Sequence, residues 1–355
     1  MSLETLTHLN TQTLIGHTSA RGHAWHYRAE LQGAEPNHYP GAIPVDDVAR
    51  RLFPWNPELR PIAVERPASL DQMTHLNASG LPVRWAEIPG RQAVVRSDSF
   101  GGDVMGLFTT SYEPHPYRTW LLDAVSQLLD DELSISSAGV LKNGAVAWVE
   151  ISVADSLPTP EGVLFRPNLL ATTTFDGSLA TTYKRTVTDV VCDNTRAAAL
   201  SEHGEAVKVR HSRHSRLRLA DARDALAIVY DTADAFSAEV RELCATPVSN
   251  REFARFLDAW VPIAVKGEPL TGKALTLATR KRDEIRDLWD YDPRVAPWRG
   301  TAHGALQAVN TYEHHSRPVR GATRAERNML RTLTDDFADL DHKAHQVLTE
   351  ILAAV

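Results

Sequence analysis

The chain has 355 residues, of which 43% are hydrophobic and 23% charged, and its formal net charge is −7. These fractions are close to those of ordinary globular proteins, and the length allows one large domain or two smaller ones. The mild acidity excludes a protein that coats nucleic acid through its overall charge, but it is compatible with a local basic groove.

Cysteine usage and the first residues point to the reducing cytosol. Cys192 and Cys244 are too few for a Cys-rich zinc site or a disulfide framework, so we expect two buried free thiols. The first ten residues lack a basic stretch followed by an apolar one, and no apolar run reaches the roughly 18 residues of a membrane span. The sequence therefore predicts no signal peptide, no transmembrane helix and a cytoplasmic location.

Residues 1–58 are expected to form an N-terminal arm with one helix. Pro44 suits a first helical position, and apolar residues follow it at helical spacing. Metal-ligand spacing is absent around the histidines of this region, which are His17, His23 and His26. We expect these side chains to be polar and partly packed rather than bound to a metal.

Residues 59–246 are expected to form an α+β core domain. Asn143-Gly144 and Asp176-Gly177 each separate two β-favouring runs. Such dipeptides are strong hairpin signals, because both residues tolerate positive φ. Two consecutive hairpins predict an antiparallel meander, and an apolar stripe at residues 219–243 predicts a long helix that backs it. A short helix is expected to begin near Asp193 and to run to Leu200.

The C-terminal region, residues 247–355, is expected to be all-helical. Helices are expected at about residues 272–289 and 301–315. Two further helix starts have the spacing of a capping box, at Ser249 with Glu252 and at Thr323 with Glu326. The predicted fold class is α+β: an antiparallel β-meander sheet backed by helices, with an all-helical C-terminal part.

Catalytic motifs are incomplete in this sequence. Residues 267–274 match the GxxxxGK phosphate loop, but they place Ala274 where a hydroxyl should hold Mg²⁺, and they follow an expected helix instead of a strand. Nucleophile-elbow, HExxH and dinucleotide-binding motifs are absent. The acid pairs Asp130-Asp131 and Asp335-Asp336 are expected on solvated helix faces. The sequence therefore predicts no catalytic residue, no metal site, no cofactor and no ATP hydrolysis.

The sharpest functional signal is a basic segment at residues 208–218. It holds five Lys or Arg residues and no acid, so the remainder of the chain carries −12 against a local +5. Such asymmetry is typical of a groove that follows phosphates. On the preceding hairpin strand, Tyr183 lies beside two cations, and single-strand binders use such rings to stack bases. The expected nucleic-acid-binding residues are Tyr183, Lys184, Arg185, Arg196, Lys208, Arg210, Arg213, Arg216 and Arg218. A charged edge strand that resists aggregation would have the same composition, so that interpretation stays open.

Several segments resemble a known family. The chain resembles the phage/plasmid-like proteins, a family built on a domain of unknown function and found on phages and plasmids. The resemblance spans roughly residues 25–315, and it is carried by residues 91–114, 138–153, 175–200, 208–226 and 301–315. The resemblance implies no particular chemistry. It implies that the protein belongs to a mobile element and, if a phage encodes it, that it is located in the cytoplasm of the host cell.

A more remote likeness is in the order of the elements. Two hairpins followed by a helix, with basic residues around the last strand, are similar to the Rad-type single-strand annealing proteins, whose β-β-β-α core assembles into rings or filaments. This likeness implies that Lys184, Arg185, Arg196 and the cations of residues 208–218 line a DNA groove. We therefore expect a homo-oligomer that binds and anneals single-stranded DNA without a cofactor in phage or plasmid recombination. A mobile-element enzyme, such as a metal-dependent nuclease or a nucleotide-modifying protein, and an accessory protein that binds a host protein remain alternatives.

Overall fold

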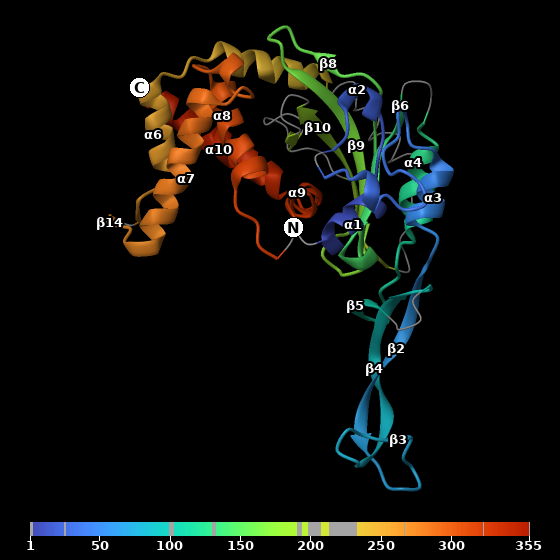
Figure 1. Ribbon diagram of the computed structural model, residues 1–355. Helices are drawn as coiled ribbons and strands as arrows, with labels where there is room; N and C mark the ends of the chain where they lie inside the picture. Colours follow the sequence, from blue (N-terminus) through green and yellow to red (C-terminus); the bar gives the residue numbers. More distant parts are fainter. Residues whose placement is uncertain are drawn as a thin grey trace.

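The computed structural model describes residues 3–24, 26–98, 103–129, 133–189, 194–197, 207–212, 233–265, 267–321 and 323–354. Three parts are visible in Figure 1. A β-sheet body carries the N-terminal helices, a narrow β-ribbon projects from this body, and a C-terminal helical part arches away on the other side. The α+β class, the antiparallel sheet and the helical C-terminal part agree with the sequence prediction.

The central sheet is antiparallel throughout. In the described part of the chain it has eight strands, in the order β1-β6-β7-β9-β10-β11, with β8 beside β9 and β12 beside β10. The strand bounds are β1 Thr13–Ile15, β6 Leu133–Leu141, β7 Val146–Val153, β8 Leu157–Pro158, β9 Leu164–Thr174, β10 Thr181–Asp189, β11 Asn194–Ala197 and β12 Val207–Val209.

Both predicted hairpin turns are present. A 3₁₀ turn, η3 (Lys142–Gly144), joins β6 to β7, and within it Asn143 and Gly144 have φ angles of 55° and 94°. The second turn joins β9 to β10, and Gly177 has a φ of 76° there. Positive φ is tolerated by Asn and Gly, which explains why the two dipeptides fix the meander.

One face of the sheet packs against helices that precede it in the chain. Alternate residues of β7 and β9, among them Val149 and Leu169, enter a large apolar core. The other side of this core comes from α3 (Val45–Leu52), the π-helix η2 (Arg118–Asp123) and α4 (Ala124–Ser126). The meander therefore has a fully covered apolar face, as expected for a sheet buried in a domain.

The opposite face of the sheet meets the C-terminal part through Trp148. Trp148, Val146 and Leu170 pack against Leu333 at the end of α9 (Arg324–Leu333). Gly139 lies opposite Trp148 on β6, and a Cβ atom at Gly139 would fall 2.2 Å from the indole ring. A glycine is required here because the Trp148 ring occupies the space that a Cβ atom would take.

After the meander, the predicted short helix is wrong and the predicted backing helix agrees with the structure over the described residues. The predicted short helix at residues 193–200 is wrong where the structure describes it, because residues 194–197 form β11 and pair with β10. Strand pairing along the end of β10 overrides the local helical preference. Residues 233–245 are helical, and Phe236 and Val240 pack on Phe165 of β9, as the prediction of a backing helix requires. The earlier residues of that predicted helix lie outside the described residues.

The projecting ribbon is a second, small antiparallel sheet. β2 (Pro57–Pro67) and β4 (Pro82–Arg96) pair along most of their length. β3 (His75–Leu76) pairs with β4 toward the tip of the ribbon, and β5 (Val104–Thr109) pairs with the end of β4 nearest the body. The ribbon projects well beyond the body of the molecule (Figure 1).

The N-terminal residues are more structured than the single predicted helix. They form α1 (Leu3–Thr11), α2 (Thr18–Arg21) and the 3₁₀ turn η1 (Ala29–Leu31), in addition to α3. β1 joins the sheet through β6, and the buried Asn37 amide donates hydrogen bonds to the carbonyls of Leu9 and Thr13. These bonds hold the segment against the sheet.

The helical part consists of several packed helices. Its bounds are α6 Asn250–Trp260, the short strands β13 Ala264–Val265 and β14 Glu268–Pro269, α7 Gly272–Tyr291, η4 Ala296–Trp298, α8 Ala302–Thr311, the π-helix η5 Tyr312–Ser316, α9, and α10 Asp336–Ala353. Its apolar core includes Phe256, Trp289 and Val309. The predicted capping box is present at Ser249 and Glu252, and Thr323 accepts a hydrogen bond from the Glu326 amide at the start of α9.

Candidate nucleic-acid interface

The predicted stacking residue, Tyr183, is a core residue. Its side chain is 1% exposed, it packs with the apolar face of the sheet, and its hydroxyl donates to the Trp120 carbonyl. Burial raises the pKa of the Tyr183 phenol well above its ordinary value. The prediction that this ring stacks on a base is therefore corrected: the alternation of β10 turns Tyr183 inward, and no ring face is open to a ligand.

Lys184 also has a structural role. Its ammonium group is buried and donates to the carbonyls of Thr332 and Leu333, and it lies 2.5 Å from a carboxylate oxygen of Asp335. Cations are favoured at a helix C-terminus, where unpaired carbonyls gather, so Lys184 fixes the end of α9 to the sheet. Its three donors point at these acceptors, so the expectation that it contacts phosphate is corrected as well.

The remaining predicted cations differ in position. Arg185 is half-buried on the same strand as Tyr183, and Arg196 lies in β11. Lys208 and Arg210 are exposed, and the Lys208 ammonium lies 3.6 Å from Asp335. Arg213, Arg216 and Arg218 lie outside the described residues. Within the described residues, the predicted strip therefore contributes two exposed cations, Lys208 and Arg210.

His211 of the basic segment belongs to a column of stacked rings. It lies between Tyr112 and His115, with ring centroids 5.1 Å and 4.1 Å away, and His115 stacks on Trp120 at 3.6 Å. Hydroxyl groups of Thr173 and Thr181 lie within hydrogen-bond distance of the His211 ring. Burial lowers the pKa of His211 to about 4, and burial together with His211 lowers the pKa of His115 to about 3. Both rings are neutral at pH 7, so this end of the segment offers no charge to a phosphate.

A larger group of cations surrounds Glu313, which the π-helix η5 turns into the protein. The Glu313 side chain is 1% exposed, and three cations contact its carboxylate: Lys281 at 3.0 Å, Arg317 at 2.6 Å and Arg331 at 3.1 Å. Two more arginines lie at the same place. Arg327 donates to the Glu313 carbonyl at 2.5 Å, and Arg324 donates to the Arg317 carbonyl at 2.9 Å. We call these five cations, Lys281, Arg317, Arg324, Arg327 and Arg331, the arginine cluster.

The five cations of this cluster outnumber the single carboxylate at its centre, and the pKa values respond to both burial and charge. Burial alone would raise the pKa of Glu313, but Lys281 and Arg317 outweigh burial and lower it to about 2. Burial and the neighbouring guanidinium groups of Arg331, Arg317 and Arg324 lower the pKa of Arg327 to about 10. Burial is the first cause of this lowering and the like charges add to it, whereas at Arg317 the hydrogen bond to Glu313 raises the pKa. An added anion would relieve the repulsion between the like charges.

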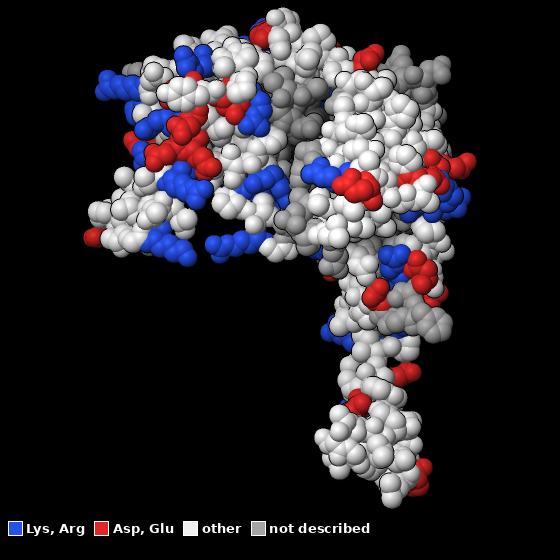
Figure 2. Space-filling view, in the orientation of Figure 1, with Lys and Arg blue, Asp and Glu red and all other residues white. Residues whose placement is uncertain are grey.

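The arginine cluster is connected to Lys208 through two acids at the start of α10. Arg331 contacts Asp336 at 3.9 Å, and the adjacent Asp335 contacts Lys208. Figure 2 shows Lys and Arg side chains gathered along the lower side of the helical part, next to the open space beside the ribbon. We call the arginine cluster together with Lys208 the strip, because these ion pairs link cations of α7, α9 and β12 through Glu313, Asp335 and Asp336.

Two aromatic rings lie beside Lys281, one buried and one partly exposed. The Lys281 ammonium lies 5.1 Å from the ring centroid of Tyr312, which is a core residue, and 5.8 Å from that of Trp260. Trp260 is only partly buried and also lies beside the Lys343 ammonium, at 5.7 Å. An aromatic ring beside cations is the arrangement that binds a base next to a phosphate.

A second basic segment of the sequence corresponds to this cluster. Residues 317–331 hold five arginines and one acid, Glu326. Thr323 and Glu326 in this segment have the spacing of a capping box, so the local pattern predicts a helix start and does not by itself predict a binding site. Lys281 and Glu313 come from other helices, and their approach to the arginines is visible only in the fold.

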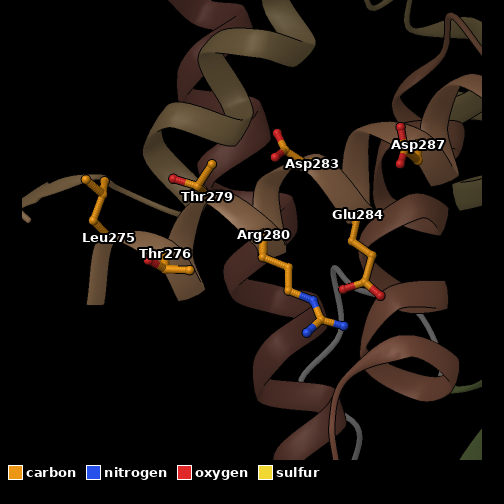
Figure 3. Close-up of a pocket in the computed structure, with 7 residues that line it drawn as sticks. All are labelled: Leu275, Thr276, Thr279, Arg280, Asp283, Glu284 and Asp287. Atoms are coloured by element: carbon orange, nitrogen blue, oxygen red, sulfur yellow. The ribbon is translucent and has the colours of Figure 1, made fainter. Parts of the chain in front are cut away.

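A surface pocket along α7 has the opposite chemistry. Figure 3 shows that its lining comes from α7 and includes three carboxylates and one guanidinium group: Leu275, Thr276, Thr279, Arg280, Asp283, Glu284 and Asp287. Such a pocket repels phosphates. In the described part of the chain, no three His, Cys, Asp or Glu side chains are grouped to hold a metal ion. Nor does any described helix have the length and apolarity that crossing a membrane requires.

Comparison with known protein families matches residues 104–334 to the family described as Domain of unknown function (DUF932). The chain belongs to the DUF932 family. The DUF932 region begins at the first residue of β5 and ends just after α9, so it includes Lys208, Glu313 and the whole arginine cluster. The β2–β4 ribbon and α10 lie outside it. No curated protein and no solved structure matches the chain.

Proposed function

We propose that this protein binds single-stranded nucleic acid through backbone phosphates, on the arginine cluster and Lys208, and that it promotes strand annealing without a nucleotide cofactor. The observation that carries the proposal is that five cations gather around one buried carboxylate, Glu313, which three of them contact directly. A chain of phosphates supplies the missing negative charge. Annealing brings two anionic strands together, and a cationic surface lowers the repulsion between them.

The setting of this activity follows from the resemblance described above. Proteins borne by phages and plasmids meet single strands during recombination and replication, and we propose that this protein acts on such strands in the cytoplasm. Its likeness to the Rad-type annealing proteins is one of element order, so we use it only to suggest the class of activity. The site differs from the one that this likeness implies, because Lys184 and Tyr183 are structural and the arginines of α9 take their place.

Exposed cations of the strip can be tested against a matched set elsewhere. Arg317, Arg320 and Lys208 are exposed and belong to the strip or its flank, whereas Arg251, Lys273 and Arg286 are exposed on other surfaces of the helical part. Each set of three would be changed to Gln, which removes the same charge in both proteins. Binding of a fluorescent single-stranded oligonucleotide would then be measured by anisotropy without ATP or Mg²⁺.

We expect the strip variant to bind at least tenfold more weakly than the parent, and the matched variant to bind almost as the parent does. The thermal unfolding midpoint of the matched variant should agree with that of the parent. The strip variant should unfold at a slightly lower temperature, because Arg317 also contacts the buried Glu313 carboxylate, but it should remain folded at the temperature of the binding assay. Equal weakening by the two sets would show that net charge alone governs binding, and would refute the proposed site. Annealing of complementary strands, followed by quenching of paired dyes, should fall in the same order.

A further inference from the structure

The β2–β4 ribbon exposes apolar side chains that a soluble monomer usually buries. Trp85 is 56% exposed, Val64 is 40% exposed, and Leu76 near the tip is 54% exposed. A two-stranded ribbon has no core of its own and is only marginally stable in water without a partner. Since most of the ribbon lies away from the rest of the molecule (Figures 1 and 2), its faces are open to another molecule.

Strand register separates the charges of the ribbon onto its two faces. In the regular part, Arg66 lies directly opposite Arg84, and Val64 lies opposite Ala86, so these four residues share one face. The other face carries Glu65 opposite Trp85 and Glu87 opposite Ala63. All four charged side chains are exposed. We call the first the basic face and the second the acidic face.

Each face carries charges that the opposite face of another ribbon can pair. Like charges directly opposite on neighbouring strands destabilise a sheet, so the Arg66–Arg84 pair costs free energy in the isolated ribbon. On the acidic face, Glu65 is paired with His75 at 2.9 Å, and Trp85 stacks on the same histidine with centroids 4.9 Å apart. Placing the acidic face of one ribbon on the basic face of another pairs carboxylates with guanidinium groups and covers Trp85 and Val64.

The outer edge of the ribbon is poorly suited to binding. β2 contains three prolines, Pro57, Pro61 and Pro67. Proline lacks the N–H group that an added strand would require, and prolines on an edge strand are a common protection against strand addition. Docking is therefore expected on the faces and not by extension of the sheet.

We propose that the ribbon is an assembly element, whose basic face docks on the acidic face of the ribbon of a second copy of this chain. Residues 57–95 carry four acids and four Lys or Arg residues, so two ribbons do not repel each other as two chains of net charge −7 would. The contact joins two different surfaces, so each copy can bind one neighbour on either side, and assembly continues beyond a dimer into a ring or an open chain. This inference does not depend on the proposed nucleic-acid binding.

The contact is small, so it is expected to be weak and to depend on concentration. The regular part has five residue pairs, which span about 17 Å at the usual rise per residue. An interface of this size falls at the low end of known interfaces, below roughly 1,200 Å² in total. Assembly should therefore be sought with the full chain at tens of micromolar and at low salt, by sedimentation velocity.

Charge reversal provides the test. In one variant, Arg66→Glu and Arg84→Glu make both faces acidic, and in a second, Glu65→Arg and Glu87→Arg make both faces basic. Each variant alone should sediment as a monomer under conditions in which the parent forms larger species. An equimolar mixture of the two should assemble again, because an acidic face of one variant then meets a basic face of the other. The variant with all four changes should also assemble.

The control changes exposed charges away from the ribbon. Arg251→Glu with Arg286→Glu alters the net charge by the same amount as the first variant and should leave assembly intact. A monomeric parent at 100 micromolar, or failure of the mixture to assemble, would overturn the proposal. If the first variant instead keeps its assembly state and loses oligonucleotide affinity, the basic face contacts nucleic acid and the proposed ribbon-to-ribbon contact is wrong.

Discussion

The Lys184 ammonium lies 2.5 Å from the Asp335 carboxylate, and this pair ties β10 of the central sheet to the junction between α9 and α10. Asp335 has a φ of 67°, in the left-handed region, where the chain turns from α9 into α10. Because α9 also carries three of the arginines around Glu313, the position of the arginine cluster depends on this contact.

Replacing Lys184 with Met should reduce the free energy of unfolding by about 2–3 kcal/mol, because it leaves the carbonyls at the end of α9 and the Asp335 carboxylate without their main partner. The matched change Lys208→Met removes an exposed partner of the same carboxylate and should cost less than about 1 kcal/mol. Urea unfolding at pH 7 measures both. Equal effects of the two changes would contradict the structural role of Lys184.

Acid should weaken the fold below pH 6.5 through the buried histidines. The pKa values of His115 and His211 in the folded protein are about 3 and about 4, below the ordinary value of 6.5. The unfolded chain therefore binds protons first as the pH falls, and stability is full above pH 6.5 and declines toward pH 4. Each histidine should contribute a slope of about 1.4 kcal/mol per pH unit.

Urea unfolding at pH 7.5, 6 and 5 would measure this decline. The change His211→Asn keeps a polar side chain in the ring column and removes one titrating group, so its stability should depend less steeply on pH than that of the parent. A parent protein equally stable at pH 7.5 and pH 5 would show that these rings are not neutral and buried in solution.

Gly139 should tolerate no side chain. Because a Cβ atom would lie 2.2 Å from the Trp148 ring, Gly139→Ala must displace the indole that joins the sheet to α9. We expect a loss of about 1–3 kcal/mol, which is the usual cost of overpacking a core. Gly41→Ala is the control, since no heavy atom lies within 4 Å of a Cβ atom built there. Similar unfolding midpoints for both variants would contradict this packing.

The GxxxxGK segment should not support ATP turnover. It contains β14 and the first turn of α7, Lys273 is exposed there, and Ala274 cannot hold Mg²⁺ as a hydroxyl would. Lys273→Ala should have the same background phosphate release as the parent in a coupled assay with MgATP. Turnover that depends on Lys273 would refute this prediction.

Local patterns in the sequence predicted the elements that short-range chemistry determines. Asn143 and Gly144 readily adopt the positive φ that a tight turn requires, and Ser249 and Glu252, three residues apart, cap a helix with each other's backbone and side-chain groups. The segment at residues 194–197 was misassigned because its strand conformation comes from pairing with β10, which lies in the fold and not in the local sequence.

The candidate site was harder to predict, because it depends on which face each residue takes. Tyr183 and Lys184 are adjacent in a strand and point to opposite faces. The composition of the segment predicted that both bind nucleic acid, but both side chains are buried within the protein. Glu313 appears in the sequence as one acid among many. Its importance follows from burial and from three cations that approach it from α7, the loop after η5, and α9.

The salt dependence of single-strand binding tests the central claim most directly. The association constant of the parent for a fluorescent single-stranded oligonucleotide would be measured between 50 and 300 mM NaCl and plotted as its logarithm against the logarithm of salt concentration. About four phosphate contacts on the strip predict a slope near −3, at roughly −0.7 for each contact. Removing Arg317, Arg320 and Lys208 should flatten this slope by about 2 on the same rule. A parent slope near zero, or a slope unchanged by the triple substitution, would contradict phosphate binding at this site.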